Sequence, residues 1–460
     1  MKRLNIIDTV FLQIETREQL MHVASVLILK KPESYDGDYF KDLVTGMRQV
    51  KQFIEPFNQK LKYPPFKLGL PHWVVDDNID LDFHIRHSAI PGPGSYEQLY
   101  TLISRLHSSL LDRSRPLWEF HIIEGLEGDR FAIYFKVHHA CIDGLGRMKA
   151  IQRILSTSPE NRKIRAPWQA VPDEKKDNNE SVEQAFLERI KAQISTVPEL
   201  INLLLRSTGY LTEPHKMKAP LPFNAPVSSI NVVTSAQRRF ASQDLSLAEI
   251  KQIGKKMGAT VNDVVMVICS GALRHYLLKH HDLPEKSLIA FVPVSIQTQS
   301  KGHVSNQLSN ILCKLGTDVA DPLERLRIIV ESSREGKEKI SGLSKEAAQN
   351  LMLILQSPMF TIQLLQMQNQ TVPAFNLVIS NYPGPKEQLY LNGATMEAIY
   401  PVSFLFGGQG LNITVTSYHG KLCFGLLACR DGIPKIQELA KYLSESFEEL
   451  KRAVDGKTGM

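Results

Sequence analysis

Apolar and polar side chains alternate along residues 131–138, which predicts a β-strand. One face of this strand carries the apolar residues Phe131, Ile133, Phe135 and Val137. Continuing the alternation places His139 on this apolar face and His138 on the opposite face. The pattern then breaks, and Gly144 allows a tight turn in which two backbone segments approach closely.

The same patterns predict a chain in which helices and strands are mixed. Strands are expected over residues 22–29, 81–90, 118–125, 238–245, 291–296 and 376–380, and one antiparallel set over 395–402, 410–418 and 421–429. Helices are expected over residues 38–51, 96–111, 145–155, 181–193, 199–211, 247–257, 261–280, 322–343, 345–367 and 434–454, and a short helix or turn is expected over residues 7–14. The strand over 118–125 is expected to pair with the strand over 131–138. His107 is expected on the surface or at the cap of its helix.

With 460 residues, the chain is too long for one ordinary hydrophobic core, so we expect two domains. Prolines and a charged run punctuate residues 166–222, which we interpret as a linker that carries helices. The predicted fold is mixed α/β, with one domain over residues 1–165 and the other over residues 223–460.

Composition and charge narrow the class of protein. Hydrophobic residues make up 43% of the chain and charged residues 22%, as in a globular protein. The net charge of +6 is mild, and no dense block of lysine and arginine suggests nucleic-acid binding. This charge suits an anionic ligand or a membrane surface.

Cysteine usage and hydropathy indicate a cytoplasmic protein. The five cysteines are scattered without a CxxC pair, as expected for reduced thiols. No secretory signal is expected, and the most apolar stretch, residues 351–367, is interrupted by Pro358. Any contact with the inner membrane or with lipid inclusions is therefore expected to be peripheral.

The strand over residues 131–138 ends in the pattern HHxxxDG, formed by His138, His139, Asp143 and Gly144. By residue frequencies alone, such a match arises in roughly one chain in a thousand. The alternative interpretations are a metal site, which needs further ligands, and a buried core histidine. Cys141, inside the motif, raises a third alternative, a thiol nucleophile.

This motif resembles the signature of the CoA-dependent acyltransferase superfamily, which includes chloramphenicol acetyltransferase and peptide-synthetase condensation domains. Further segments are similar to the bacterial wax ester synthase/diacylglycerol acyltransferase family: PLW at residues 116–118, ND at 262–263 and SNYPGP at 380–385. The resemblance covers about residues 4–450. One departure is Tyr382, which stands where the family commonly has valine.

The resemblance implies two chloramphenicol-acetyltransferase-like subdomains with mixed sheets and an active-site tunnel between them. It implies that His139 is the general base, with His138 in a supporting role. It also implies that Asp143 braces the loop by pairing with an arginine, for which we suggest Arg238 or Arg239. Gly144 completes the motif.

Four further positions are implied to contact substrate: Trp118, Asn381, Gly384 and Pro385. Asn262 follows the predicted helix cap Thr260, where its amide and the helix N-terminus suit an anion or a carbonyl oxygen. Simple helix capping is the alternative role for Asn262. No metal and no cofactor are expected, because acyl-CoA is itself a substrate.

The function predicted from the resemblance is transfer of a fatty acyl group from acyl-CoA to a hydroxyl. The acceptor is a long-chain alcohol, in wax ester synthesis, or diacylglycerol, in triacylglycerol synthesis and lipid storage. One alternative is a superfamily relative that acylates a polar acceptor. The other is an inactive protein that binds lipid surfaces.

Overall fold

The computed structural model describes residues 2–4, 6–64, 70–142, 144–169, 219–300, 303–340, 362–363, 365, 367 and 372–458. The chain forms two compact units, each assembled from segments far apart in the sequence. The first comprises Met1–Glu174, Thr234–Ala248 and Tyr382–Ala440; the second comprises Lys175–Val233, Glu249–Asn381 and Lys441–Met460. The expected domains were contiguous, whereas the first unit includes a late return of the chain. Most of the expected linker lies outside the described residues.

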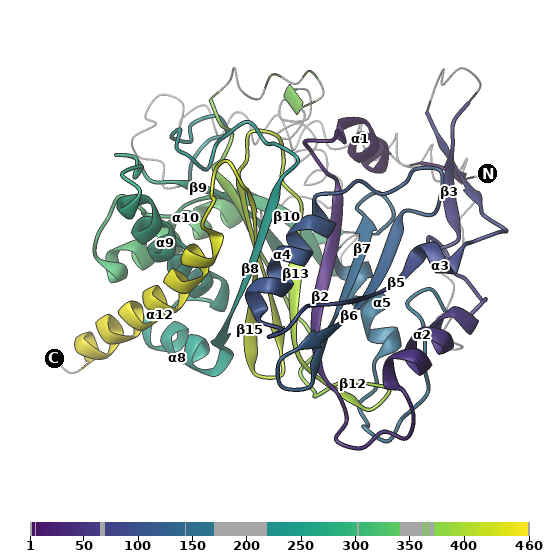
Figure 1. Cartoon of the computed structure of the whole chain (residues 1–460). Coiled ribbons are helices and arrows are strands. Elements are labelled where there is room, and N and C mark those ends of the chain that lie inside the picture. The colour runs from purple at the N-terminus through teal and green to yellow at the C-terminus, as the bar shows by residue number, and fades with distance from the viewer. Residues whose placement is uncertain are drawn as a thin grey trace. The chain divides into compact units, whose positions relative to one another are not determined.

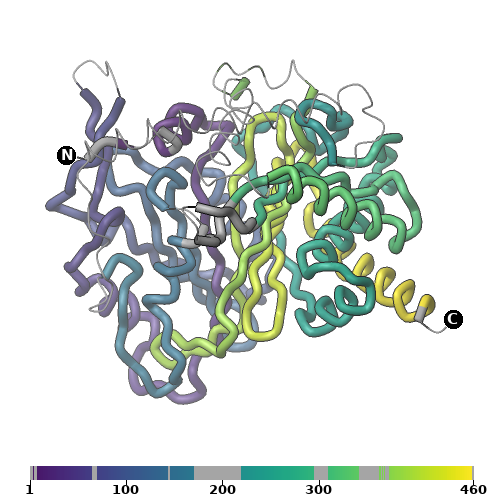
Figure 2. Tube along the Cα trace, turned by 180° about the vertical axis from the view of Figure 1, so that it is seen from behind, coloured from purple at the N-terminus to yellow at the C-terminus, as the bar shows by residue number. Residues whose placement is uncertain are grey.

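Six strands form the main sheet of the first unit. In sheet order they are β12 (Tyr390–Leu391), β13 (Ala394–Val402), β2 (His22–Lys30), β7 (Arg130–His138), β6 (Trp118–Leu126) and β5 (Ile85–Ala89). All neighbours are antiparallel except β5 and β6, which are parallel, so the sheet is mixed as predicted. Figures 1 and 2 show the late β13 beside the early β2.

The pairing of β13 corrects the prediction of one antiparallel set at the C-terminal end. β14 (Leu411–Tyr418) pairs with β15 (Lys421–Cys429), and β15 pairs with β8 (Arg238–Ser246). β13 instead joins β2 in the main sheet. It passes so close to β15 that a Cβ atom on Gly425 would lie 1.8 Å from the carbonyl oxygen of Pro401. Glycine is therefore required where the two strands meet.

A second correction concerns residues 81–90, which were predicted as one strand. The chain first forms a short helix, α3 (Leu81–His84), and only then β5. Asp80 starts this helix, because its carboxylate accepts the N–H groups of Asp82 and Phe83. The remaining elements of the first unit are β1 (Lys2–Arg3), β3 (Gln59–Lys62), β4 (His72–Val75), α1 (Ile6–Ile14), α2 (Tyr39–Gln49), α4 (Tyr96–His107) and α5 (Gly144–Ile154).

Helix α4 runs along β8, which pairs with β15 on its other side (Figure 1). Ser95 and Gln98 start α4 with a reciprocal capping box. On β8, the N–H groups of Arg238 and Phe240 donate to the hydroxyls of Ser108 and Ser104, each at 2.9 Å. One step further, the hydroxyls of Ser242 and Tyr100 lie 2.7 Å apart.

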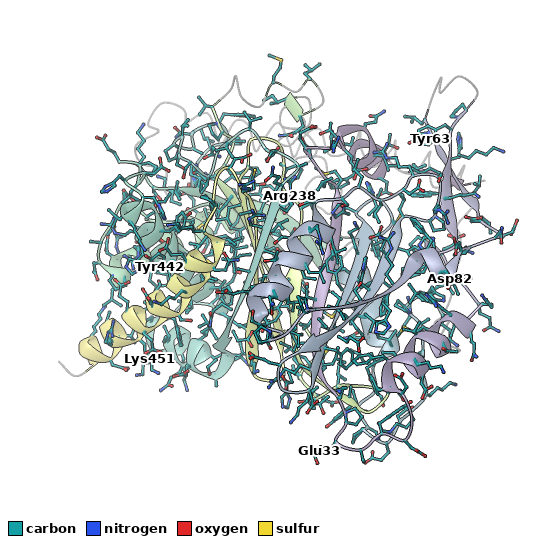
Figure 3. The ribbon with its side chains drawn as sticks, in the orientation of Figure 1. Glu33, Tyr63, Asp82, Arg238, Tyr442 and Lys451 are labelled. Carbon is teal, nitrogen blue, oxygen red and sulfur yellow. The ribbon has the colours of Figure 1, made fainter. Side chains whose placement is uncertain are left out.

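The register between α4 and β8 has a geometric basis. Four helical residues rise about 6.0 Å, and two strand residues rise about 6.8 Å. Hydroxyls four residues apart in and just after α4 are therefore spaced like every second residue of the antiparallel β8. Figure 3 labels Arg238 at the start of this strand.

The second unit contains a mixed set of strands and several helices. β9 (Ile289–Ser300) pairs antiparallel with β10 (His303–Lys314) and parallel with β11 (Leu377–Tyr382). β10 was not predicted from the sequence. The helices are α8 (Leu247–Met257), α9 (Val261–Lys279), α10 (Pro322–Ile340) and α12 (Ile436–Thr458), whose residues from 441 onward belong to this unit.

Helix α9 is the central apolar element of the second unit. Thr260 and Asp263 start it with a capping box, and Asp263 also accepts a hydrogen bond from Ser333 of α10. Within the described parts of the chain, α9 is the one helix with the length and composition of a membrane span. Its most apolar window is 72% buried inside the protein, as in the core helix of a globular fold.

Candidate active site

Strand β7 brings the two histidines to the end of the main sheet. His138 pairs with His22 of β2, and its N–H donates to the carbonyl of Leu117, at 3.0 Å. The N–H of His139 donates to the carbonyl of Met21, at 2.8 Å. Neighbours on both sides thus hold the backbone of the pair.

The ring of His138 is fully buried, and both of its nitrogens face polar atoms. Nδ1 accepts the N–H of Ala140 at 3.0 Å. The proton of the neutral ring must therefore sit on Nε2, which lies 3.2 Å from Oε1 of Glu15. This ring stabilises the turn that follows the strand.

The ring of His139 is half-buried and lies between two phenylalanines. Its centroid is 4.3 Å from that of Phe11 on α1 and 5.2 Å from that of Phe404, which follows β13. The predicted apolar surroundings of His139 are therefore present. Strand parity alone does not separate the two histidines, because both faces of β7 are buried.

Of the other motif residues, Asp143 lies outside the described residues. Gly144, predicted in the turn before the helix, is the first residue of α5. Cys141 is half-buried, and burial, followed by the carboxylates of Asp8 and Glu15, raises the pKa of its thiol. A raised pKa disfavours the thiolate, so Cys141 does not have the lowered pKa of an activated nucleophilic thiol.

The proposed arginine partner of Asp143 can be described only from the arginine side. Arg238 is 1% exposed, and its guanidinium donates to the carbonyls of Ser235 and Glu18. Burial lowers its pKa to about 10. Arg239 donates to the carbonyl of Arg238, at 3.3 Å. Pairing of either arginine with Asp143 stays a prediction.

Trp118 lies in the core of the first unit. Its indole N–H donates to the carbonyl of Phe57 at 2.9 Å, and its ring stacks on those of His84 and Trp168. The side chain is 1% exposed. These contacts describe an aromatic core that supports the end of β7, and a substrate contact by Trp118 stays a prediction.

Asn262 lies in the first turn of α9 and is half-buried. The capping role proposed as its alternative is filled by Thr260 and Asp263. Asn262 is therefore not the residue that caps the helix. Its predicted contact with an anion or a carbonyl oxygen stays a prediction.

The segment SNYPGP continues from β11 into a loop. Asn381 is half-buried near the end of β11. Gly384 packs against β14, where its N–H donates to the hydroxyl of Ser417 at 3.0 Å. A Cβ atom there would lie 2.2 Å from the carbonyl oxygen of Ser417. The carbonyl of Pro385 accepts the N–H of His419, at 3.2 Å.

Comparison with known proteins gives this geometry a family. A model described as the wax ester synthase/diacylglycerol acyltransferase catalytic domain matches residues 4–265, and one for the WS/DGAT C-terminal domain matches residues 304–451. The chain belongs to the wax ester synthase/diacylglycerol acyltransferase family.

Relatives match nearly the whole chain. The O-acyltransferase WSD of Acinetobacter baylyi is 39% identical, over 97% of this chain and 96% of its own length. A probable diacylglycerol O-acyltransferase of Mycobacterium tuberculosis is 37% identical, over 97% of this chain and 98% of its own. This family membership makes the chain an O-acyltransferase.

Solved structures agree on the fold. The wax ester synthase/diacylglycerol acyltransferase from Marinobacter aquaeolei superposes with a TM-score of 0.79, at 35% identity, over 99% of this chain and all of that one. The first condensation domain of the CDA synthetase gives a TM-score of 0.59 at 13% identity, over 98% of this chain and 96% of that domain. The latter shows the shared fold alone, which is the predicted superfamily fold.

Tyr382, the departure from the family pattern, contacts the helix that follows the motif. Its hydroxyl accepts a hydrogen bond from Nη2 of Arg147, at 3.3 Å. Arg147 is 3% exposed, and its Nη1 has no hydrogen-bond partner among the described residues. This contact connects α5 to the start of the loop that contains Gly384.

A buried polar network lies behind β7. His107 was expected on the surface or at the cap of its helix, but it is 1% exposed. Its Nε2 donates to the carbonyl of Ser403 at 2.8 Å. Its Nδ1 accepts a hydrogen bond from the hydroxyl of Tyr134, also at 2.8 Å. Its location corrects the prediction. The helix ends at His107 instead of residue 111, and at this end the buried Lys136 donates to the carbonyls of Leu106 and Ser109.

Glu15 is the residue beside the motif that sequence reasoning missed. Its proximity to His138 depends on tertiary contact between distant segments, for which the sequence carries no local signal.

Among the described residues, no group of three or more His, Cys, Asp and Glu side chains could hold a metal ion.

Proposed function

We propose that this enzyme transfers a fatty acyl group directly from acyl-CoA to the hydroxyl of a long-chain alcohol or of diacylglycerol, with His139 as general base. The observation that carries this proposal is the difference in burial and surroundings between the rings of His138 and His139. His138 is fully buried with both nitrogens facing polar atoms. His139 is half-buried between Phe11 and Phe404, in surroundings that suit an apolar substrate.

The transfer proceeds in two steps. His139 takes the proton of the acceptor hydroxyl while its oxygen attacks the thioester carbonyl carbon. The carbonyl oxygen becomes an oxyanion, which needs a hydrogen-bond donor or a helix dipole. The intermediate then collapses, the carbon–sulfur bond breaks, and the imidazolium of His139 returns the proton to the thiolate of CoA. The products are an ester and free CoA.

Other predicted residues have supporting roles in this proposal. His138 fixes the turn after β7, and Asp143 braces the loop together with Gly144. Asn262, in the first turn of α9, is suited to an oxyanion or anion contact because helix N-termini favour negative charge. Asn381, Gly384 and Pro385 shape a loop beside the substrate, and Trp118 supports the sheet from which the histidines emerge.

The partners follow from the acceptor chemistry. The relatives named above are described as wax ester synthase and diacylglycerol acyltransferases, which supports acyl-CoA as donor and either acceptor. Both acceptors are lipids, so the proposal includes a cytoplasmic enzyme that meets the inner membrane or lipid inclusions peripherally. It includes no metal and no further cofactor.

A single assay tests the function. The purified chain is mixed with palmitoyl-CoA and with hexadecanol, dipalmitoylglycerol or a short polar alcohol, and free thiol and ester are measured. Ester formation with either lipid acceptor is expected. Turnover with the polar alcohol alone would favour the polar-acceptor alternative, and no turnover with any acceptor would favour the inactive lipid-binding protein.

A second assay separates direct transfer from a covalent intermediate. Direct transfer needs both substrates, so acyl-CoA alone should release no stoichiometric burst of CoA. Cys141→Ser should keep most of the activity. A burst with the acyl group trapped on Cys141, absent from the Cys141→Ser variant, would replace the proposal with a covalent mechanism.

A further inference from the structure

Glu15 is a buried carboxylate directly after α1 whose two oxygens contact different groups. Oε1 accepts the N–H of Met21 at 3.1 Å and lies 3.2 Å from Nε2 of His138. Oε2 accepts Nη2 of Arg113 at 2.9 Å and Nε at 3.3 Å. The carboxylate side chain is 2% exposed. A charge removed from water to this extent persists only when it is paired and hydrogen-bonded.

The carboxylate reaches both histidines of the motif. It faces the ring of His138 directly. It reaches His139 through Met21, since the N–H of Met21 donates to Glu15 and the carbonyl of Met21 accepts the N–H of His139. One side chain therefore contacts the ring of the first histidine and the peptide that holds the second.

Arg113 keeps this carboxylate in place from the other side. Its Nη2 also donates to the carbonyl of Leu12, at 2.7 Å, and its Nη1 to the hydroxyl of Tyr63, at 3.3 Å. Tyr63 follows β3 and is labelled in Figure 3. The guanidinium is thus tied to α1 and to Tyr63, so the ion pair has a fixed position.

The charge of Glu15 is consistent with this arrangement. Burial raises its pKa, but His138 and Arg113 outweigh burial and lower the pKa to about 2. Glu15 is therefore ionised at neutral pH and can only accept hydrogen bonds. The N–H of Ala140 at Nδ1 selects the Nε2–H tautomer of His138, and the negative charge of Glu15, 3.2 Å from Nε2, favours the same tautomer.

We propose that Glu15 is a positioning residue of the acyl transfer. Its carboxylate fixes the tautomer and orientation of His138 and, through Met21, the backbone of His139, so that the base meets the acceptor hydroxyl in one geometry. This role rests on the proposed function. Its effect should fall on turnover more than on substrate binding, because small displacements of reacting groups cost roughly a hundredfold in rate.

The test compares three variants in the palmitoyl-CoA assay. Glu15→Gln keeps the size of the side chain and removes its charge, and Glu15→Asp keeps the charge but withdraws it from His138. Glu18→Gln is the matched control, because Glu18 is a nearby exposed carboxylate. We expect kcat to fall roughly 10–100-fold for Glu15→Gln and less for Glu15→Asp, with KM within about twofold. The control should match the wild type.

A spectroscopic readout distinguishes positioning from a purely structural role. Histidine ¹⁵N NMR should show the Nε2–H tautomer of His138 in the wild type. Glu15→Gln should change the Nε2 chemical shift of His138, because the charged group beside that nitrogen is lost.

Unchanged kcat and an unchanged Nε2 chemical shift of His138 in a folded Glu15→Gln variant would overturn the proposal. If Glu15→Gln does not fold, the kcat of Glu15→Asp is the test. A kcat equal to that of the wild type in Glu15→Asp would then overturn the proposal. Failure of the proposed function has a different signature, in which the wild type itself forms no ester with any acceptor. The NMR readout on the wild type still applies then, and an Nδ1–H tautomer of His138 would refute the role of Glu15.

Discussion

At the residue scale, two adjacent histidines differ because one ends a strand and the next begins a turn. His138 shares the burial of β7 and contacts the backbone of Ala140 and the carboxylate of Glu15. His139 leaves the sheet and lies against Phe11 and Phe404. Sequence alone identified the pair, but parity was an insufficient reason to separate them, because the sheet buries both faces.

Substituting each histidine should separate their roles. His139→Ala is expected to lower kcat by about 10²–10⁴-fold with little change in melting temperature, since it removes the proposed general base and such a loss costs this much. His138→Ala should lower kcat less and the melting temperature more, because it removes a buried side chain that braces the turn. Steady-state kinetics and thermal melting check both. Greater loss of kcat in His138→Ala would reverse the assignment.

At the element scale, the strands were largely predictable, but their partners were not. Residues 395–402 form a strand as expected, yet β13 pairs with β2, which lies near the other end of the chain. Alternation within a strand reports which faces are buried and carries no information about the neighbour. His107 was misplaced for a related reason, because its burial depends on Tyr134 and Ser403 from other elements.

The crossing of β13 and β15 gives an element-scale prediction. Gly425→Ala should destabilise the fold by about 1–3 kcal/mol or more, because the new methyl group collides with the backbone of Pro401. Gly456→Ala in α12 is the matched control, since a Cβ atom there meets nothing within 4 Å. Alanine favours helix over glycine by up to about 1 kcal/mol. Urea denaturation measures both, and equal stability of the two variants would contradict the crossing.

At the scale of the whole molecule, buried titratable groups determine how stability depends on pH. Burial, followed by the nearby Lys136, lowers the pKa of His107; burial and then His107 lower that of His22. Burial alone would raise the pKa of Glu119, but His121 and Lys136 lower it to about 2. In the folded protein at neutral pH, His22 and His107 are therefore neutral and Glu119 is ionised.

Acidification should therefore destabilise the protein in two stages. Below about pH 6.5 the unfolded chain protonates His22 and His107 while the folded chain does not, so stability falls as pH decreases. Below about pH 4.5 the contributions of Glu15 and Glu119 are lost in the same direction, each worth roughly 3 kcal/mol at neutral pH. Urea denaturation between pH 7.5 and 4 measures the first stage and the start of the second.

A pair of variants assigns the first stage. His107→Gln should be less stable at pH 7.5, and the difference from the wild type should shrink toward pH 5.5. His281→Asn, at an exposed histidine, is the matched control. A constant difference for His107→Gln across this range would show that His107 does not remain neutral in the folded chain.

The hydroxyls of Ser104 and Ser108, which accept hydrogen bonds from β8, have a consequence for how copies of this protein behave at high concentration. An uncovered strand edge invites pairing with another chain and so promotes aggregation. Ser104 and Ser108 occupy the N–H groups of β8 that a foreign strand would need. Ser104→Ala combined with Ser108→Ala should therefore increase light scattering during prolonged incubation well below the melting temperature, whereas Thr101→Ala, on the exposed face of α4, should not. On this argument, α4 and Ser108 protect the edge of β8 from pairing with another copy of the chain, which is a role separate from ester formation.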